Sequence, residues 1–186
     1  MSDGLQKFHS AVRWGKPVAE IEALVGADPS VVNGEDEKNG NSAIHIAAQN
    51  GHIELTKYLQ SKGANLNAQN KKGQTALHMS VEYDFTAQTE FLLASGADKD
   101  LKNGDGHPAI LGIDGGKTGA DAWDAPIKRL KAVTDEKSMK EAFMLLEQAK
   151  AEDIDKAVLA QAGMKLKKEF AAFWDHKAFM AIVQKF

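Results

Sequence analysis

The chain has 186 residues, of which 43% are hydrophobic and 26% charged, the mixture of a globular protein rather than a disordered one. A formal net charge of −3 argues against a dedicated nucleic-acid-binding protein, which needs a strongly basic surface. The sequence contains no cysteine, which excludes disulfide bonds, thiolate zinc sites and cysteine nucleophiles. Because neither a membrane span nor a secretory signal is visible, we expect a cytoplasmic protein, with the nucleus as the alternative location.

The first predicted unit, residues 5–33, contains two short helices. Its segment from Phe8 to Gly15 parallels the segment from Ile44 to Gly51 at an offset of 36 residues. We expect the additional residues to form a widened loop around Pro29, and we expect this unit to cap the repeats that follow.

The next two units, residues 36–69 and 70–102, repeat with a period of 33 residues. Gly40–His45 aligns in this register with Gly73–His78, and the correspondence continues through the rest of both units. A single match would mean little, but about a dozen matches in one register indicate a true repeat architecture.

Local signals place two helices in each of these units. Ser42 and Thr75 precede apolar runs and are residue types that cap a helix N-terminus. Gly63 and Gly96 follow the second helix, where a left-handed backbone is common. Since no unit can bury its apolar face alone, the units must stack on one another.

A degraded fourth unit is expected from residue 103 to about residue 132. The helix start of the earlier units is replaced here by Pro108–Leu111. Gly112–Thr118 superficially resembles a phosphate-binding loop, but the first glycine of that motif would have to be residue 111, which is leucine. A widened inter-helix loop is therefore the favoured interpretation.

The repeated residues resemble the ankyrin repeat. The resemblance covers residues 5–132 and rests on Asp36, Gly40, Ser42–His45, Ala47–Ala48, Gly51–His52, Leu59, Gly63–Ala64 and Asn67, with their partners one period later. It implies an all-α ankyrin-repeat solenoid with short β-hairpin turns over residues 1–132. It also implies that His45 and His78 bond to the backbone and fix the turns between units, rather than bind a metal.

Residues 133–186 lack the repeat and are predicted to form a C-terminal helical subdomain. Met139, Ala142, Phe143 and Leu146 share one face of a helix that Ser138–Glu141 would cap. We expect a second helix to end at Gly163. The segment 165–186 combines lysines with aromatic residues, which is typical either of a packed helix or of a surface helix that binds peptides or lipids.

The resemblance implies non-catalytic protein binding on the concave face formed by hairpin tips and inner helices. Tryptophan, tyrosine and arginine dominate interface hot spots, which favours the exposed positions of the repeat that carry them. We expect no catalytic residue, cofactor or metal ion, and a monomeric chain that acts as an adaptor, inhibitor or assembly factor. The alternative is a peptide- or lipid-binding helical extension with the stack as its scaffold. The candidate partner-binding residues are Arg13, Trp14, Asn50, Lys71, Lys72, Glu82, Tyr83, Asp105 and His107.

Overall fold

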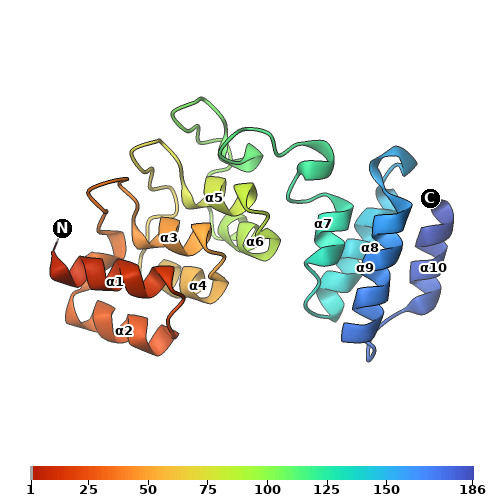
Figure 1. Cartoon of the computed structure of the whole chain (residues 1–186), viewed down its shortest axis with the longest axis horizontal. Helices are drawn as coiled ribbons and strands as arrows, with labels where there is room; N and C mark the ends of the chain where they lie inside the picture. The colour runs from red at the N-terminus through yellow and green to blue at the C-terminus, as the bar shows by residue number, and fades with distance from the viewer. Residues whose placement is uncertain (1) are drawn as a thin grey trace. The chain divides into compact units, whose positions relative to one another are not determined.

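The computed structural model describes residues 2–186, with residue 153 described by its backbone alone. The chain forms two compact units, one ending at Thr118 and the other spanning Gly119–Phe186. Figure 1 shows the first unit in red to green and the second in green-blue to blue.

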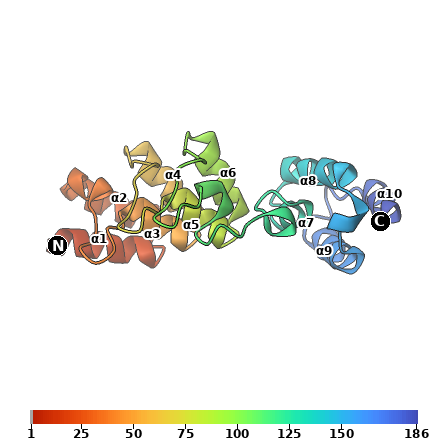
Figure 2. The same cartoon turned by 90° about the horizontal axis from the view of Figure 1, so that it is seen from above.

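The first unit is a stack of helix pairs. The inner helices α1, α3 and α5 pack on their neighbours in a row, and the outer helices α2, α4 and α6 form a parallel row behind them (Figure 2). This arrangement confirms the expected all-α ankyrin-repeat solenoid. The helices are α1 (Asp3–Arg13), α2 (Val18–Ala27), α3 (Ala43–Gln49), α4 (Ile53–Ser61), α5 (Ala76–Glu82) and α6 (Thr86–Ala94), with 3₁₀ turns η1 (Pro29–Asn33) and η2 (Ala109–Leu111).

Histidines connect each unit of the stack to the next. The Nδ1 of His45 accepts a hydrogen bond from the backbone N–H of Ser42 at 3.2 Å, so the proton must lie on Nε2. Nε2 donates to the carbonyl oxygens of Ala68 at 2.9 Å and Gln74 at 3.0 Å, which belong to the following hairpin. His78 repeats the pattern, with its Nε2 3.1 Å from the carbonyl oxygen of His107. The expectation that these histidines fix the turns between units agrees with this geometry.

The apolar faces of the helices meet between the two rows. Phe8, Ile44 and Leu77 on the inner helices and Leu59 and Leu92 on the outer helices are each 0% exposed. Burying each such side chain contributes about 1.5–3 kcal/mol relative to leaving it in water. The stack therefore has a continuous core that runs through successive units.

The fourth repeat is shorter than its register predicts. The expected inner helix is reduced to the three-residue turn η2, because Pro108 offers no capping side chain and Gly112 leaves the helix with φ 80°. Residues 113–118 form a loop, as expected. Within the described residues, pairing between strands is limited to an isolated antiparallel bridge between Lys102 and Pro108.

The second unit is a helical bundle that begins earlier than the expected boundary at residues 132/133. Helix α7 (Pro126–Lys131), which the repeat register assigned to the stack, packs instead on α8 (Glu136–Gln148) and α9 (Lys156–Glu169). Leu130 is fully buried in the bundle core. The unit is completed by α10 (His176–Lys185) and the 3₁₀ turns η3 (Gly119–Asp121) and η4 (Ala151–Asp153).

Two local expectations for this bundle were wrong. Helix α8 is capped by Asp135, not Ser138: the Asp135 carboxylate accepts from the N–H of Ser138 at 2.8 Å, and the Ser138 hydroxyl accepts from the N–H of Asp135 at 3.1 Å. Gly163 does not end a helix but lies in the middle of α9, where a Cβ atom would overlap the ring of Phe179. The glycine allows two helices to approach closely.

The aromatic residues of the last segment pack on one another inside the bundle. Trp174 lies between Phe143, at 5.9 Å between ring centroids, and Phe179, at 4.9 Å. Phe170 and Phe173 stack at 5.3 Å. Among the described helices, none combines the length and the apolar character that crossing a membrane requires.

Candidate partner-binding groove

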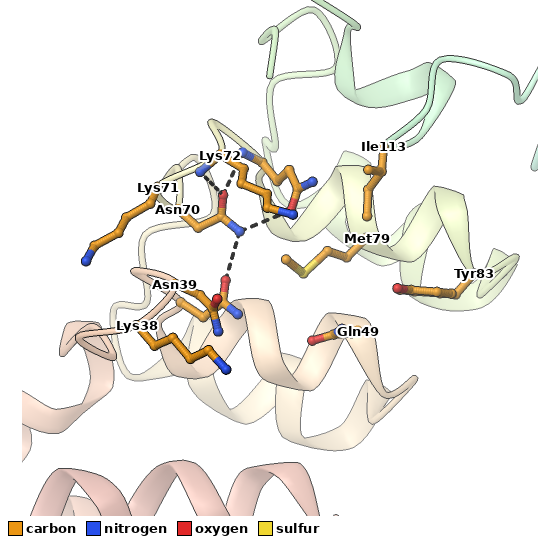
Figure 3. Close-up of a pocket in the computed structure, with 11 residues that line it drawn as sticks. Lys38, Asn39, Gln49, Asn70, Lys71, Lys72, Met79, Tyr83 and Ile113 are labelled. Atoms are coloured by element: carbon orange, nitrogen blue, oxygen red, sulfur yellow. Dashed lines mark hydrogen bonds between the residues drawn. The ribbon is translucent and has the colours of Figure 1, made fainter. Parts of the chain in front are cut away.

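A hollow of about 450 Å³ lies between the hairpin tips and the inner helices α3 and α5 (Figure 3). We call it the concave groove. It is lined by Lys38, Asn39, Asn41, Gln49, Asn70, Lys71, Lys72, Gln74, Met79, Tyr83 and Ile113.

Polar side chains fold each hairpin tip locally. The Asp36 carboxylate accepts hydrogen bonds from the backbone N–H groups of Asn39 at 2.6 Å and Asn41 at 3.0 Å. The side-chain carbonyl of Asn70 does the same one period later, for Lys72 at 2.9 Å and Gln74 at 3.0 Å. Such side-chain-to-backbone bonds hold a turn in one conformation.

Neighbouring tips are also joined to each other. The N–H of Lys71 donates to the carbonyl of Asn39 at 2.9 Å, and the N–H of Gly104 donates to the carbonyl of Lys72 at 2.8 Å. The Asn70 side-chain amide donates to the Asn41 side-chain oxygen at 2.9 Å. These bonds make the tips one preorganised wall of the concave groove.

The wall is basic. Among the described residues, three lysines and no carboxylate line the concave groove, although the first unit as a whole has fifteen acidic and eleven basic residues. The Lys71 ammonium donates to the carbonyl of Glu37, and in Figure 3 its side chain points away from the other lining residues. Lys38 and Lys72 extend toward the helices, and no hydrogen bond or ion pair joins their ammonium groups to the atoms that the structure describes.

The opposite end of the concave groove is apolar. Met79 comes from α5, Tyr83 is the C-cap residue of that helix, and Ile113 comes from the loop after η2. The carboxylate of Glu82 fastens this loop, because it accepts hydrogen bonds from the N–H groups of Ile113 at 2.8 Å and Asp114 at 3.2 Å. Tyr83 remains 46% exposed beside this fixed loop.

Tyr83 is one of three residues that occupy equivalent positions in successive repeat units. Trp14, Asn50 and Tyr83 are the C-cap residues of the inner helices α1, α3 and α5. Trp14 is 75% exposed, an unusual state for the largest apolar side chain. Two of the three equivalent positions thus present an aromatic ring to solvent.

A family model described as three copies of ankyrin repeats matches residues 8–103, just over half of the chain. The chain belongs to the ankyrin repeat family. The ankyrin repeat domain of Bcl-3, a member of the IkappaB family, is a structural neighbour with a TM-score of 0.52 and 28% sequence identity. The match covers 55% of this chain and 44% of that one.

Curated relatives share only short stretches with this ankyrin protein. Alpha-latrotoxin-Lt1a of Latrodectus tredecimguttatus is 42% identical over 50 residues, which are 27% of this chain and 4% of the toxin. The NAD-capped RNA hydrolase NUDT12 of Homo sapiens is 34% identical over 65 residues, which are 35% of this chain and 14% of the hydrolase. The chain thus spans a small part of these relatives, whose names describe their own activities. Ankyrin repeats generally mediate protein–protein interaction.

The structure brings only some of the predicted partner-binding residues of this ankyrin stack together. Lys71, Lys72 and Tyr83 line the concave groove. Arg13 and Trp14 are exposed at the end of α1 but do not line it, and Asp105 is exposed on the third tip.

Other candidates make contacts within the fold. The side-chain amide of Asn50 donates to the carbonyl of Ile46 at 2.7 Å. Glu82 holds the loop that carries Ile113, and a ring nitrogen of His107 lies 3.1 Å from the carbonyl oxygen of Ile113. These three residues therefore shape the concave face from within the ankyrin stack.

Eight of the eleven lining residues are not among the candidates from the sequence, and Asn70, Met79 and Ile113 are the hardest of these to predict. Asn70 is 8% exposed and Met79 is 3% exposed, so both resemble core positions of the repeat. Ile113 reaches the concave groove from the irregular loop of the fourth repeat, where the register carries no information.

The buried histidines offer no metal site. Among the side chains that the structure describes, no three histidine, aspartate or glutamate groups converge closely enough to hold an ion. The rings of His9, His45 and His78 all lie within hydrogen-bond distance of backbone carbonyl oxygens.

Proposed function

We propose that this chain is a non-catalytic protein-interaction module, an adaptor, inhibitor or assembly factor, whose partner binds the concave face. The observation that carries the proposal is Tyr83, an exposed ring beside a rigid hollow that Lys38 and Lys72 also line. Rigid presentation lowers the entropic cost of association, because the binding surface is already ordered before the partner arrives.

Trp14 extends the proposed surface beyond the concave groove. Adjacent packed helices lie about 8–10 Å apart, so Trp14 on α1 and Tyr83 on α5 are separated by roughly 20 Å. A contact that spans both rings suits a standard protein–protein interface of about 800 Å² per partner. Aromatic residues at such positions are typical hot spots.

The alternative function, binding of peptides or lipids by the helical extension, is less well supported. The aromatic side chains on which it depends pack against the core of the second unit, and Phe179 is part of that core. The lysine at the end of α10 is also occupied, because the Lys185 ammonium donates to the carbonyls of Glu147 at 2.6 Å and Ala149 at 2.7 Å.

The double variant Trp14→Ala/Tyr83→Ala tests the proposed function in a quantitative pull-down from lysate of the source organism. We expect the partner to be lost, because two hot-spot truncations of about 2 kcal/mol each weaken binding by roughly three orders of magnitude. Circular dichroism should show an unchanged fold, since both side chains are exposed.

The matched control is Val18→Ala/Met164→Ala, which removes two apolar side chains that are exposed elsewhere, at 36% and 70%. This control should retain the partner. If the folded Trp14→Ala/Tyr83→Ala variant also retained it, the concave face would not be the binding surface.

A further inference from the structure

The charge of the concave groove differs from that of its surroundings. Lys38 and Lys72 come from successive hairpin tips and have no anionic partner within the described part of the chain. Both ammonium groups line the same groove, so each adds to a positive potential there that a negatively charged ligand would neutralise. The natural complement of this wall is therefore an anion.

The anion must be short. Glu35, Asp36 and Glu37 on the first tip and Asp105 on the third tip flank the lysines, and the first unit has more acidic than basic residues overall. A long polyanion such as a nucleic acid would meet these carboxylates as well as the lysines. A segment with only one or two negative charges would avoid them.

The neutral lining residues suit a polypeptide backbone. The exposed amides of Asn39 and Gln49 offer both hydrogen-bond donors and acceptors, as the peptide groups of an extended chain require. Farther along, Met79, Tyr83 and Ile113 form an apolar end that would bury one large side chain.

We propose that the concave groove binds an extended segment of a partner protein in which one or two carboxylates lie next to a large apolar side chain. The carboxylates pair with Lys38 and Lys72, and the apolar side chain packs against Met79, Tyr83 and Ile113. This inference rests on the proposed function and specifies the chemistry of the partner.

The rigidity of the tips supports this mode of recognition. The Asn41, Asn70 and Gln74 network is buried and fixes the positions from which Lys38 and Lys72 project. The anchored side chain of Lys71 holds the two tips together rather than binding the segment. Lys38 and Lys72 therefore provide the electrostatic specificity, and Lys71 maintains the wall.

The test is selection of random twelve-residue peptides by the intact chain, followed by fluorescence anisotropy on a synthetic peptide with the selected sequence. We expect the selected sequences to place aspartate or glutamate beside leucine, isoleucine, methionine or an aromatic residue. At about 50 mM salt, Lys38→Glu/Lys72→Glu should weaken binding about tenfold or more, because each reversed charge replaces an attraction by a repulsion.

Three controls accompany this measurement. Lys16→Glu/Lys99→Glu makes the same change in net charge at exposed lysines outside the groove and should change affinity less than about twofold. Lys38→Arg/Lys72→Arg should retain binding. A peptide with amides in place of its carboxylates should bind weakly, and Lys38→Glu/Lys72→Glu should no longer reduce its affinity.

Each contrary result has a distinct meaning. Selection of peptides without carboxylates would overturn the proposal of an acidic segment. An equal loss of peptide affinity in Lys38→Glu/Lys72→Glu and Lys16→Glu/Lys99→Glu would overturn it as well. Neither result would contradict protein binding as such. Failure to select any peptide, or tighter binding of a twelve-nucleotide single strand, would also overturn the acidic segment. The proposed function itself fails only if the Trp14→Ala/Tyr83→Ala variant keeps its protein partner.

Discussion

Three buried histidines have equivalent roles in the ankyrin stack. His9, His45 and His78 lie at corresponding positions of the inner helices, and each has Nε2 within 3.1 Å of a carbonyl oxygen of the following segment. For His45 and His78, Nδ1 accepts from a backbone N–H group, so the neutral ring satisfies both nitrogens. A second proton on Nδ1 would break this bond.

Acidification should therefore lower the free energy of unfolding. Burial lowers the pKa of His9, His45 and His78 below the usual value of 6.5, so below that pH the unfolded chain binds protons that the native chain excludes. The stabilisation that these neutral histidines give the fold is fully present above pH 6.5. It is lost as the pH falls through their pKa values in the native state. The loss is up to about 1.4 kcal/mol per pH unit for each histidine that stays neutral. Urea unfolding between pH 7.5 and 5.5 measures this slope.

His45→Gln should make the slope shallower even though it also destabilises the fold. His176→Gln removes an exposed imidazole and serves as the control. A slope that is unchanged by His45→Gln would show that this ring does not carry the pH dependence.

At the scale of elements, the sequence predicts helices well where the signals are local. Ser42 and Thr75 cap the inner helices α3 and α5 as expected, because the capping residue and its partner are three positions apart. The prediction failed for Gly163 and for α7, because their surroundings are set by distant residues. Glycine is a poor helix former in isolation, but here it makes room for Phe179.

Gly163→Ala should destabilise the bundle. In most helix interiors this change stabilises by about 1 kcal/mol, but here the new methyl group collides with the Phe179 ring, and overpacking costs about 1–3 kcal/mol. Gly26→Ala in α2 is the matched control, because its new methyl group would have no atom within 4 Å beyond its chain neighbours and the backbone of its own helix, and the change should be neutral or stabilising. Thermal unfolding, followed by circular dichroism, shows whether each substitution lowers or raises the unfolding temperature. Stabilisation by Gly163→Ala would mean that α9 and α10 do not approach closely.

At the scale of the whole molecule, the position of the boundary between the two units follows from packing rather than from the repeat register. The register extends the stack to residue 132, whereas Leu130 and Ile127 pack in the core of the second unit. Periodicity identifies the helix but does not identify its neighbours.

A fragment of residues 119–186 should therefore fold, and a fragment of residues 133–186 should be less stable. Loss of a buried leucine alone typically costs about 2–5 kcal/mol, and the shorter fragment lacks all of α7. Helix content and unfolding temperature, measured by circular dichroism, compare the two fragments. Equal stability would support the boundary at residues 132/133.

The candidate site, like the fold, could be predicted from the sequence only in part. Lys71 and Lys72 lie on a hairpin tip and Tyr83 lies at the end of an inner helix, so the repeat register identifies all three. Glu82 and Ile113 meet across 31 residues of sequence, and the register gives no indication that the fourth repeat would collapse into a loop that closes one end of the concave groove.

Site-specific photo-cross-linking distinguishes the concave face from every other surface of the protein. A photoreactive phenylalanine analogue replaces Tyr83 or Gln49 at the concave groove, or Lys57 on the outer helix α4, which is exposed. In lysate of the source organism, positions 83 and 49 should form the same covalent adduct, and an excess of the selected acidic peptide should suppress it. An adduct formed only from position 57, or equally from all three positions, would contradict binding in the concave groove.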